Sequence, residues 1–159
     1  MTVPATIRIQ SADFDIAAEI AALTKGNTDI GAVVSFSGIC RGGTGADAIS
    51  AMTLEHYPGM AEAEIGRHVS EAVTRWPLTG VTVIHRHGRV VPGDNIVLVL
   101  TASRHREAAF QAAEFLMDYL KTSAPFWKSE ERADSTDSLK KTWVDAQGHD
   151  DNAAARWKK

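Results

Sequence analysis

Pro125 forces a change of chain direction in the middle of a segment that carries one lysine on each side of it. Proline has no amide hydrogen and pushes the preceding residue away from helical backbone angles, so a helix that reaches this point must end near Ser123. Lys121 lies in the last turn of that helix, and Lys128 follows shortly after the proline. When the chain turns back, the two ammonium groups can converge on one anion.

Phe126 and Trp127 follow the proline directly and require burial, which would hold Lys128 against the body of the protein. The same residues have a second interpretation, in which the aromatic pair is a core anchor and both lysines are solvated. This segment alone does not decide between the two interpretations.

Length and composition restrict the class of protein. With 159 residues, 44% of them hydrophobic, the chain fits one domain with its own core. We place that domain at residues 1–148 and expect the polar segment 149–159 to be a flexible tail. The formal net charge of −3 and the pI near 6.0 argue against a general nucleic-acid binder, whose surface is normally basic. Any anion site must therefore be local.

The N-terminal residues and the cysteine content indicate the cellular compartment and exclude some kinds of site. The first ten residues lack the basic region and apolar run of a signal peptide, and no segment reaches the length of a membrane span. We therefore expect a cytoplasmic protein without a membrane partner. A single cysteine, Cys40, excludes an internal disulfide and a cysteine-rich metal site.

Hydrophobic periodicity predicts an interleaved set of strands and helices. Alternating or continuous apolar residues predict strands at 3–10, 31–40, 49–57, 81–85 and 95–101, and a short one near Trp143. Apolar residues at helical spacing predict helices at 13–25, with Asp13 as the cap, at 58–76, with Pro58 in the first turn, and at 105–123, with Phe110 and Leu116 in its buried stripe.

The order of these elements predicts the fold class. We expect 31–40 and 49–57 to pair as antiparallel strands across the loop 41–47, and 81–85 to pair with 95–101 as a hairpin or near-hairpin. Helices and strands do not alternate regularly, as they would in a doubly wound sheet. The predicted class is therefore α+β.

Two places can hold an anion. The loop 41–47 has three glycines, whose backbone amides can face a ligand, and Arg41 at its mouth. The segment from Ser103 to Arg106 precedes the longest helix, so free amides and cations share one place, and His105 there can move a proton. Each has an alternative: a mobile connection for the loop, and a Ser103 cap with solvated arginines for the second.

Other reactive side chains have simpler explanations. His85 and His87 are spaced to share a strand face and could bind metal, but no third ligand is evident, so we expect structural or solvent roles and no metal. Glu55 and His56 are adjacent on a strand and point to opposite faces. Cys40 beside a buried strand is better explained as a small apolar residue than as a nucleophile.

Four stretches carry a family resemblance. These are Leu-Glu-His-Tyr-Pro-Gly-Met at 54–60, Ile-His-Arg at 84–86 followed by Gly88, His105-Arg106 with Ala109-Phe110, and 117–128, which contains Asp-Tyr-Leu-Lys-Thr-Ser-Ala-Pro-Phe-Trp-Lys. In this order, from about residue 30 to 128, the chain resembles the large, catalytic subunit of molybdopterin synthase.

The resemblance implies a sulfurtransferase of molybdenum cofactor biosynthesis. It would convert the pterin substrate, cyclic pyranopterin monophosphate (precursor Z), into the dithiolene of molybdopterin. The sulfur would come from the thiocarboxylate on the C-terminal Gly-Gly of a ubiquitin-like small subunit. Two large subunits would form the central homodimer of a heterotetramer. The implied fold is an α/β hammerhead with a small additional β subdomain.

The resemblance also implies a site. Lys121 and Lys128 would be the catalytic residues, with Lys121 near the end of the sulfur donor and Lys128 on the pterin. The implied substrate-binding residues are Ile39, Cys40, Arg41, His105, Arg106, Lys121, Lys128, Ser129 and Glu130. No metal or other cofactor is implied, because the donor carries its own nucleophile.

Two alternative functions use the same cations. A non-catalytic adaptor could bind a ubiquitin-like C-terminal tail in the cationic groove. A small phosphate-ester hydrolase could be built on His105 and the arginines beside it.

Overall fold

The computed structural model describes residues 2–45, 48–132, 141–144 and 148–158. In chain order, its elements are β1 (Ala5–Gln10), α1 (Ile16–Thr24), β2 (Ala32–Ile39), β3 (Ile49–His56), α2 (Met60–Arg75), β4 (Leu78–Arg86), β5 (Gly88–Val90), β6 (Asn95–Ser103), α3 (Arg106–Thr122), β7 (Phe126–Arg132), β8 (Lys141–Val144) and α4 (Gly148–Ala155). The predicted α+β class and the short strand near Trp143 are confirmed.

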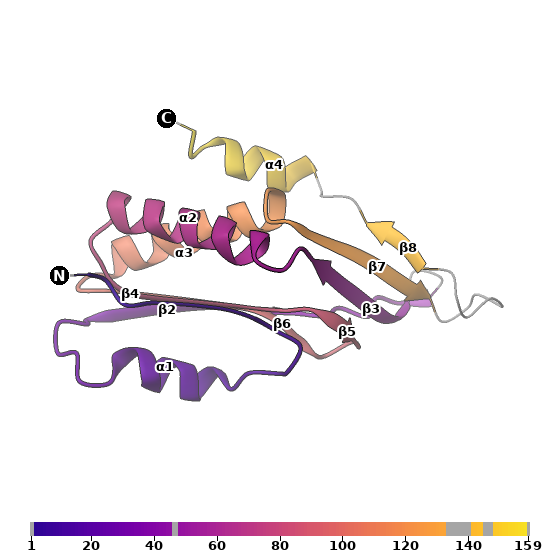
Figure 1. Ribbon diagram of the computed structural model, residues 1–159, viewed down its shortest axis with the longest axis horizontal. Helices are drawn as coiled ribbons and strands as arrows, with labels where there is room; N and C mark the ends of the chain where they lie inside the picture. Colours follow the sequence, from indigo (N-terminus) through magenta and orange to yellow (C-terminus); the bar gives the residue numbers. More distant parts are fainter. Residues whose placement is uncertain (1, 46–47, 133–140, 145–147, 159) are drawn as a thin grey trace.

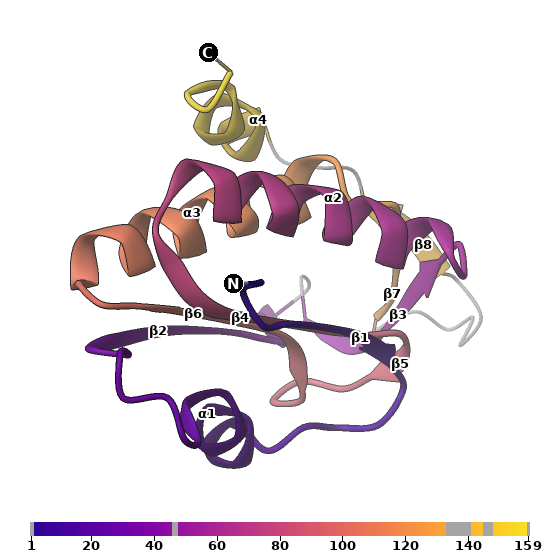
Figure 2. The ribbon, with the colours of Figure 1, turned by 60° about the vertical axis from the view of Figure 1, so that its left-hand side comes forward.

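The described strands form two sheets. The first has the order β1-β4-β6-β2, in which only β1 and β4 run parallel, and the second has the antiparallel order β5-β3-β7-β8. Helices α2 and α3 cover one face of the first sheet and α1 covers the other, while the second sheet extends to one side (Figure 1). Figure 2 shows α4 outside the layer of α2 and α3.

Burial on both faces explains the apolar runs in β4 and β6. Above them, Ile65, Val69, Phe115 and Leu116 pack against Val81, Val83 and Val99. Below them, Phe14 and partly buried residues of α1 pack against Ile84, Leu98 and Leu100. A third cluster, of Cys40, Met52, Leu54 and Val90, forms the core of the second sheet. Covering a sheet on both faces removes the usual alternation of apolar and polar residues.

The predicted pairing of 81–85 with 95–101 is confirmed as a near-hairpin with β5 between the two strands, but the predicted pairing across the loop 41–47 is wrong. β4 pairs with β6 from Leu78 to His85. β2 pairs with β6, whereas β3 pairs with β5 and β7, so β2 and β3 belong to different sheets. The end of β2 is held by the turn before β6: Cys40 N–H donates to the Asp94 carbonyl and Gly93 N–H donates to the Cys40 carbonyl, each at 2.8 Å.

Two predicted helix starts are wrong by two or three residues. Asp15, and not Asp13, caps α1 by accepting from Ala18 N–H, because Asp13 accepts instead from Phe14 and Asn95. α2 begins at Met60 rather than at Pro58, with Gly59 at φ 84° as its cap residue and the Glu62 carboxylate accepting from Gly59 N–H at 2.7 Å.

The buried face of α3 is rotated from the predicted one. Leu116 is buried, but Phe110 is 60% exposed, and Phe115 and Tyr119 are buried in its place. The helix is covered by α2 and α4 as well as by β2 and β6 of the sheet below it, so its buried face is wider than a single stripe.

Residues 149–158, within the segment expected to be a flexible tail, include most of α4 and pack on the body of the protein. The Trp157 ring lies 5.6 Å from the rings of Phe115 and Trp76, edge-on to both. Its Nε1 donates to Asp118 at 2.6 Å. The prediction missed the anchor because one tryptophan is a weak signal in a polar segment. None of the helices in the described part of the chain is long and apolar enough to span a membrane.

The layered core gives a stability prediction. Leu100→Ala removes a side chain that is completely buried beneath α1 and should lower the free energy of unfolding by about 2–5 kcal/mol. Met60→Ala removes an aliphatic side chain that is 52% exposed and should change it by less than about 0.5 kcal/mol. Urea unfolding followed by circular dichroism measures both, and equal losses would contradict the assigned core.

Candidate active site

The turn at Pro125 brings Lys121 and Lys128 together. α3 ends at Thr122, as predicted, and β7 begins at Phe126, whose N–H donates to the Ala124 carbonyl at 2.8 Å. Lys121 is exposed at the end of the helix and Lys128 is half-buried on the strand. Burial lowers the pKa of the Lys128 ammonium, and the positive charge of Lys121 lowers this pKa further. The two lysines therefore share one electrostatic environment, which we call the lysine site.

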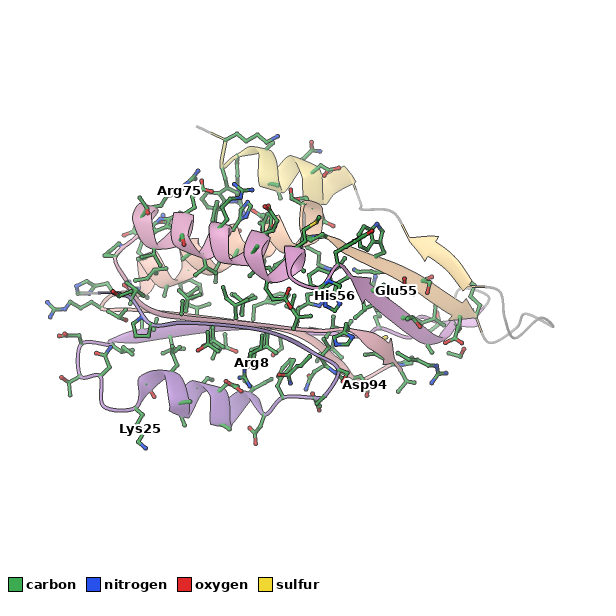
Figure 3. The ribbon with its side chains drawn as sticks, viewed as in Figure 1. Arg8, Lys25, Glu55, His56, Arg75 and Asp94 are labelled. Carbon is green, nitrogen blue, oxygen red and sulfur yellow. The ribbon has the colours of Figure 1, made fainter. Side chains whose placement is uncertain are left out.

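Phe126 and Trp127, the aromatic pair beside the two lysines, differ in burial. Phe126 packs against the main core, whereas Trp127 is 45% exposed, so the expected burial of both is wrong. Adjacent residues on a strand point to opposite faces, and only one of these faces meets the core. Trp127 contacts Tyr57 at 5.8 Å, edge-on, and both line a shallow hollow of ≈ 360 Å³ with Glu55 and His56. Figure 3 labels Glu55 and His56 at the end of β3 nearest α2.

The end of β2 belongs to the lysine site. Cys40 is buried, and the charge of Lys128 acts on its thiol. Ile39 is 56% exposed and Arg41 is exposed, so the strand end presents one apolar and one cationic side chain to solvent. Burial raises the pKa of the Cys40 thiol, and Asp94 and Glu130 raise it further. A thiol held protonated is a poor nucleophile, which agrees with the apolar interpretation of this cysteine.

Glu130 and Ser129 lie on opposite faces of β7. Glu130 shares a face with Lys128, and its carboxylate raises the pKa of that lysine, against the effect of burial. It also forms an ion pair with Arg132 at 3.3 Å. Ser129 is 1% exposed and faces away from Lys128. The geometry thus brings Glu130, but not the Ser129 side chain, to the lysine site.

His105 and Arg106 lie at the other end of α3. At about 1.5 Å of rise per residue, about 23 Å of helix separate Arg106 from Lys121. His105 is the cap residue of α3, but its side chain makes no capping hydrogen bond, so the first backbone N–H groups of the helix can donate to an anion. Arg104 is paired with Asp29 at 2.8 Å. One chain therefore presents two cationic places, the lysine site and an α3 N-terminal site.

The α3 N-terminal site opens into a surface cavity of ≈ 740 Å³. Its lining residues are Gly31, Ala32, Arg104, His105, Arg106, Glu107, Phe110 and Gln111. The cavity thus combines cations with the exposed ring of Phe110. An anionic aromatic molecule would find both kinds of contact there.

The glycine loop supports only part of the predicted anion clamp. Gly43 and Gly45 have φ of 73° and 62°, which side chains rarely adopt, so this backbone does require glycine. Residues 46–47 of the predicted clamp lie outside the described residues. Among the residues that the structure describes, no three His, Cys, Asp or Glu side chains gather closely enough to hold a metal ion.

Comparison with known proteins identifies the family. The MoaE protein family matches residues 9–123. The molybdopterin synthase catalytic subunit of Mesorhizobium japonicum is 65% identical over 153 residues, which are 96% of this chain and 93% of that protein. This chain belongs to the MoaE protein family.

Solved structures of the MoaE family show the same fold. The molybdopterin biosynthesis MoaE protein of Burkholderia ambifaria superposes with a TM-score of 0.79 at 50% identity, covering 96% of this chain and 97% of that one. The X-ray structure of molybdopterin synthase from Staphylococcus aureus superposes with a TM-score of 0.76 at 27% identity, covering 86% and 95%. The resemblance found in the sequence is confirmed.

The lysine site predicts unequal reactivity of lysines. Lys128 should react with an amine-specific acylating reagent at lower pH than Lys25, which points away from the fold beside α1 (Figure 3). Lys121→Gln should raise the pH midpoint for Lys128, because it removes a neighbouring positive charge. Mass spectrometry of peptides labelled across a pH series measures both. Lys25→Gln is the control, and equal midpoints for Lys128 and Lys25 would contradict the shared environment.

Proposed function

We propose that this MoaE family member is the large subunit of a molybdopterin synthase, working in the cytoplasm. It transfers sulfur from the thiocarboxylated C-terminal Gly-Gly of a ubiquitin-like small subunit to cyclic pyranopterin monophosphate and so forms the dithiolene of molybdopterin. The observation that carries this proposal is the convergence of Lys121 and Lys128, with Cys40 at the end of β2 within electrostatic reach of Lys128, in a fold shared with molybdopterin synthase catalytic subunits.

The charges of the substrates match the lysine site. The pterin carries a cyclic phosphate and the sulfur donor ends in an anionic thiocarboxylate, so both need cations close together. Lys121 is exposed at a helix end, where a protein tail can reach it, and we assign it to the sulfur donor. Lys128 is half-buried with a lowered pKa, which suits a group that contacts the pterin and also moves a proton.

The two cationic places of one chain are too far apart to hold one small pterin. The length of α3 separates His105 and Arg106 from the lysine site, so these two residues would have to act on the lysine site of a second copy. The homodimer implied by the family resemblance provides that copy. On this proposal, each pterin site takes the lysines from one large subunit and His105 with Arg106 from the other.

The edge strand β2 offers a geometry for this dimer. It lies at the free edge of the first sheet, begins at Ala32 beside His105, and ends at the lysine site. Its eight residues span about 27 Å, close to the distance along α3. Two β2 strands paired antiparallel would place the start of one beside the end of the other. Phe36 and Ile39, 39% and 56% exposed, would become buried.

Sulfur transfer can be assayed with Lys121→Ala and Lys128→Ala beside the unaltered chain. Each variant should lower formation of the two-sulfur pterin by about 100-fold or more, because it removes a cation that meets the reacting groups. Lys25→Ala is the matched control and should keep full activity. Mass spectrometry of the pterin products, made from precursor Z and a thiocarboxylated small subunit, measures the effect.

Other outcomes of that assay favour the alternatives. A stable complex with the small subunit but no sulfur incorporation would support the non-catalytic adaptor. Phosphate release from a phosphate ester without a partner protein would support the hydrolase built on His105.

The shared site can be tested by mixing two inactive variants. One carries His105→Ala and Arg106→Ala, and the other carries Lys121→Ala and Lys128→Ala. After subunit exchange, half of the dimers are mixed and each mixed dimer has one intact site, so about a quarter of the original activity should return. A mixture that exchanges subunits, as native mass spectrometry detects, but stays inactive would contradict a site built from two copies.

A further inference from the structure

His85 is a polar side chain in the interior of the first sheet. It lies on β4 opposite Ile9 of β1 and Val97 of β6, and 6% of it is exposed. Its Nδ1 lies 2.7 Å from the backbone carbonyl oxygen of Arg86. A carbonyl oxygen only accepts, so Nδ1 carries the hydrogen and donates it. In the neutral ring, Nε2 is then without a proton.

The His85 ring connects the first sheet to the start of β7. It stacks on Phe126, with ring centroids 3.8 Å apart and planes 15° apart. His56 of the second sheet lies 6.0 Å from the same phenyl ring, and His87 lies 4.7 Å from His56. Phe126 is therefore held by imidazoles from both sheets, at the point where the chain leaves the turn at Pro125.

His85 is also within electrostatic reach of the lysine site. Burial lowers the pKa of His85 to about 4, and the charges of Lys128, Lys121 and His56 act in the same direction, against the hydrogen bond to Arg86. The imidazole is therefore neutral at neutral pH. A charged ring would add a third cation to a place where two lysines already repel each other.

We propose that His85 is a positioning residue for the lysine site: its uncharged ring is the platform on which Phe126 stacks, and this stack fixes the end of β7 that presents Lys128. Phe126 and Lys128 are two residues apart and so share one face of the strand. Without the platform, the strand end loosens, water reaches the ammonium group, and the lysine regains an ordinary proton affinity.

The consequence for catalysis rests on the proposed function, but the effect on Lys128 does not. Four groups besides the platform face this ammonium: Lys121 from α3, Asp150 from α4, Glu130 from β7 and Cys40 after β2. All four remain in variants of the platform. A change in the ionisation of Lys128 in such variants therefore reports the placement of the lysine.

The test is a pH series of lysine acylation, read by peptide mass spectrometry, on chains that keep every lysine. His85→Ala removes one side of the stack and Phe126→Leu removes the other. Each should raise the pH midpoint for Lys128 toward the ordinary range of a lysine ammonium, because burial no longer lowers its pKa. His85→Phe keeps an uncharged ring on Phe126 and should leave the midpoint close to that of the unaltered chain. If the His85→Ala variant does not fold, the Lys128 midpoint of the Phe126→Leu variant tests the proposal.

His68 supplies the matched control. Its ring also stacks on an aromatic ring, that of Tyr119, at 3.2 Å and 13°, and its Nδ1 lies 3.0 Å from a backbone carbonyl, that of Glu64. It lies on α2, away from β7. His68→Ala should not move the midpoint of Lys128.

Two results would overturn the proposal. One is an unchanged Lys128 midpoint in a folded variant that lacks either side of the stack. The other is an equal rise in His68→Ala, which would indicate general loosening of the fold. Labelling uses no substrate, so an unaltered chain that transfers no sulfur would count against the proposed function alone.

Discussion

The rigid length of α3 determines how far apart the two cationic places of this protein lie. A helix of 17 residues keeps its ends about 25 Å apart, and here one end carries His105 and Arg106 while the other carries Lys121. Its buried face packs on β2, β6 and α2, so the helix cannot shift to bring its ends to one ligand. The chain thus has two separate cationic places, and the strand β2 runs between them at the sheet edge.

The lysine site depends on the junction of the two sheets. Pro125 ends α3 and turns the chain, Phe126 inserts into the core, and the next inward-facing residue is Lys128. The same junction lowers the pKa of that lysine, because burial and Lys121 both act against its charge. A lysine with this property can hold an anion and exchange a proton, which is the chemistry that sulfur transfer to a phosphorylated pterin requires. The stack of His85 on Phe126 joins a strand of the first sheet to a strand of the second at this junction.

Local signals in the sequence predicted most of the fold. Periodicity located the helices and strands, and Pro125 predicted the end of α3 within a residue. Which strands pair with each other was harder to predict from the sequence. β2 pairs with β6 and not with β3, because a glycine-rich connection allows either pairing and contacts with residues distant in the sequence determine which one forms. Periodicity predicted neither the exposure of Phe110 nor the anchoring of Trp157, since both depend on which elements cover α3. The convergence of Lys121 and Lys128 could be predicted from the sequence because Pro125 lies between them. The separation of His105 from them follows from helix length alone.

A crystal structure of the chain with cyclic pyranopterin monophosphate bound would test the central claim most directly. We expect one pterin between two copies, contacted by Lys128 and Arg41 of one copy and by His105 and Arg106 of the other. A pterin bound within a single copy at the N-terminus of α3, touching neither lysine, would contradict it.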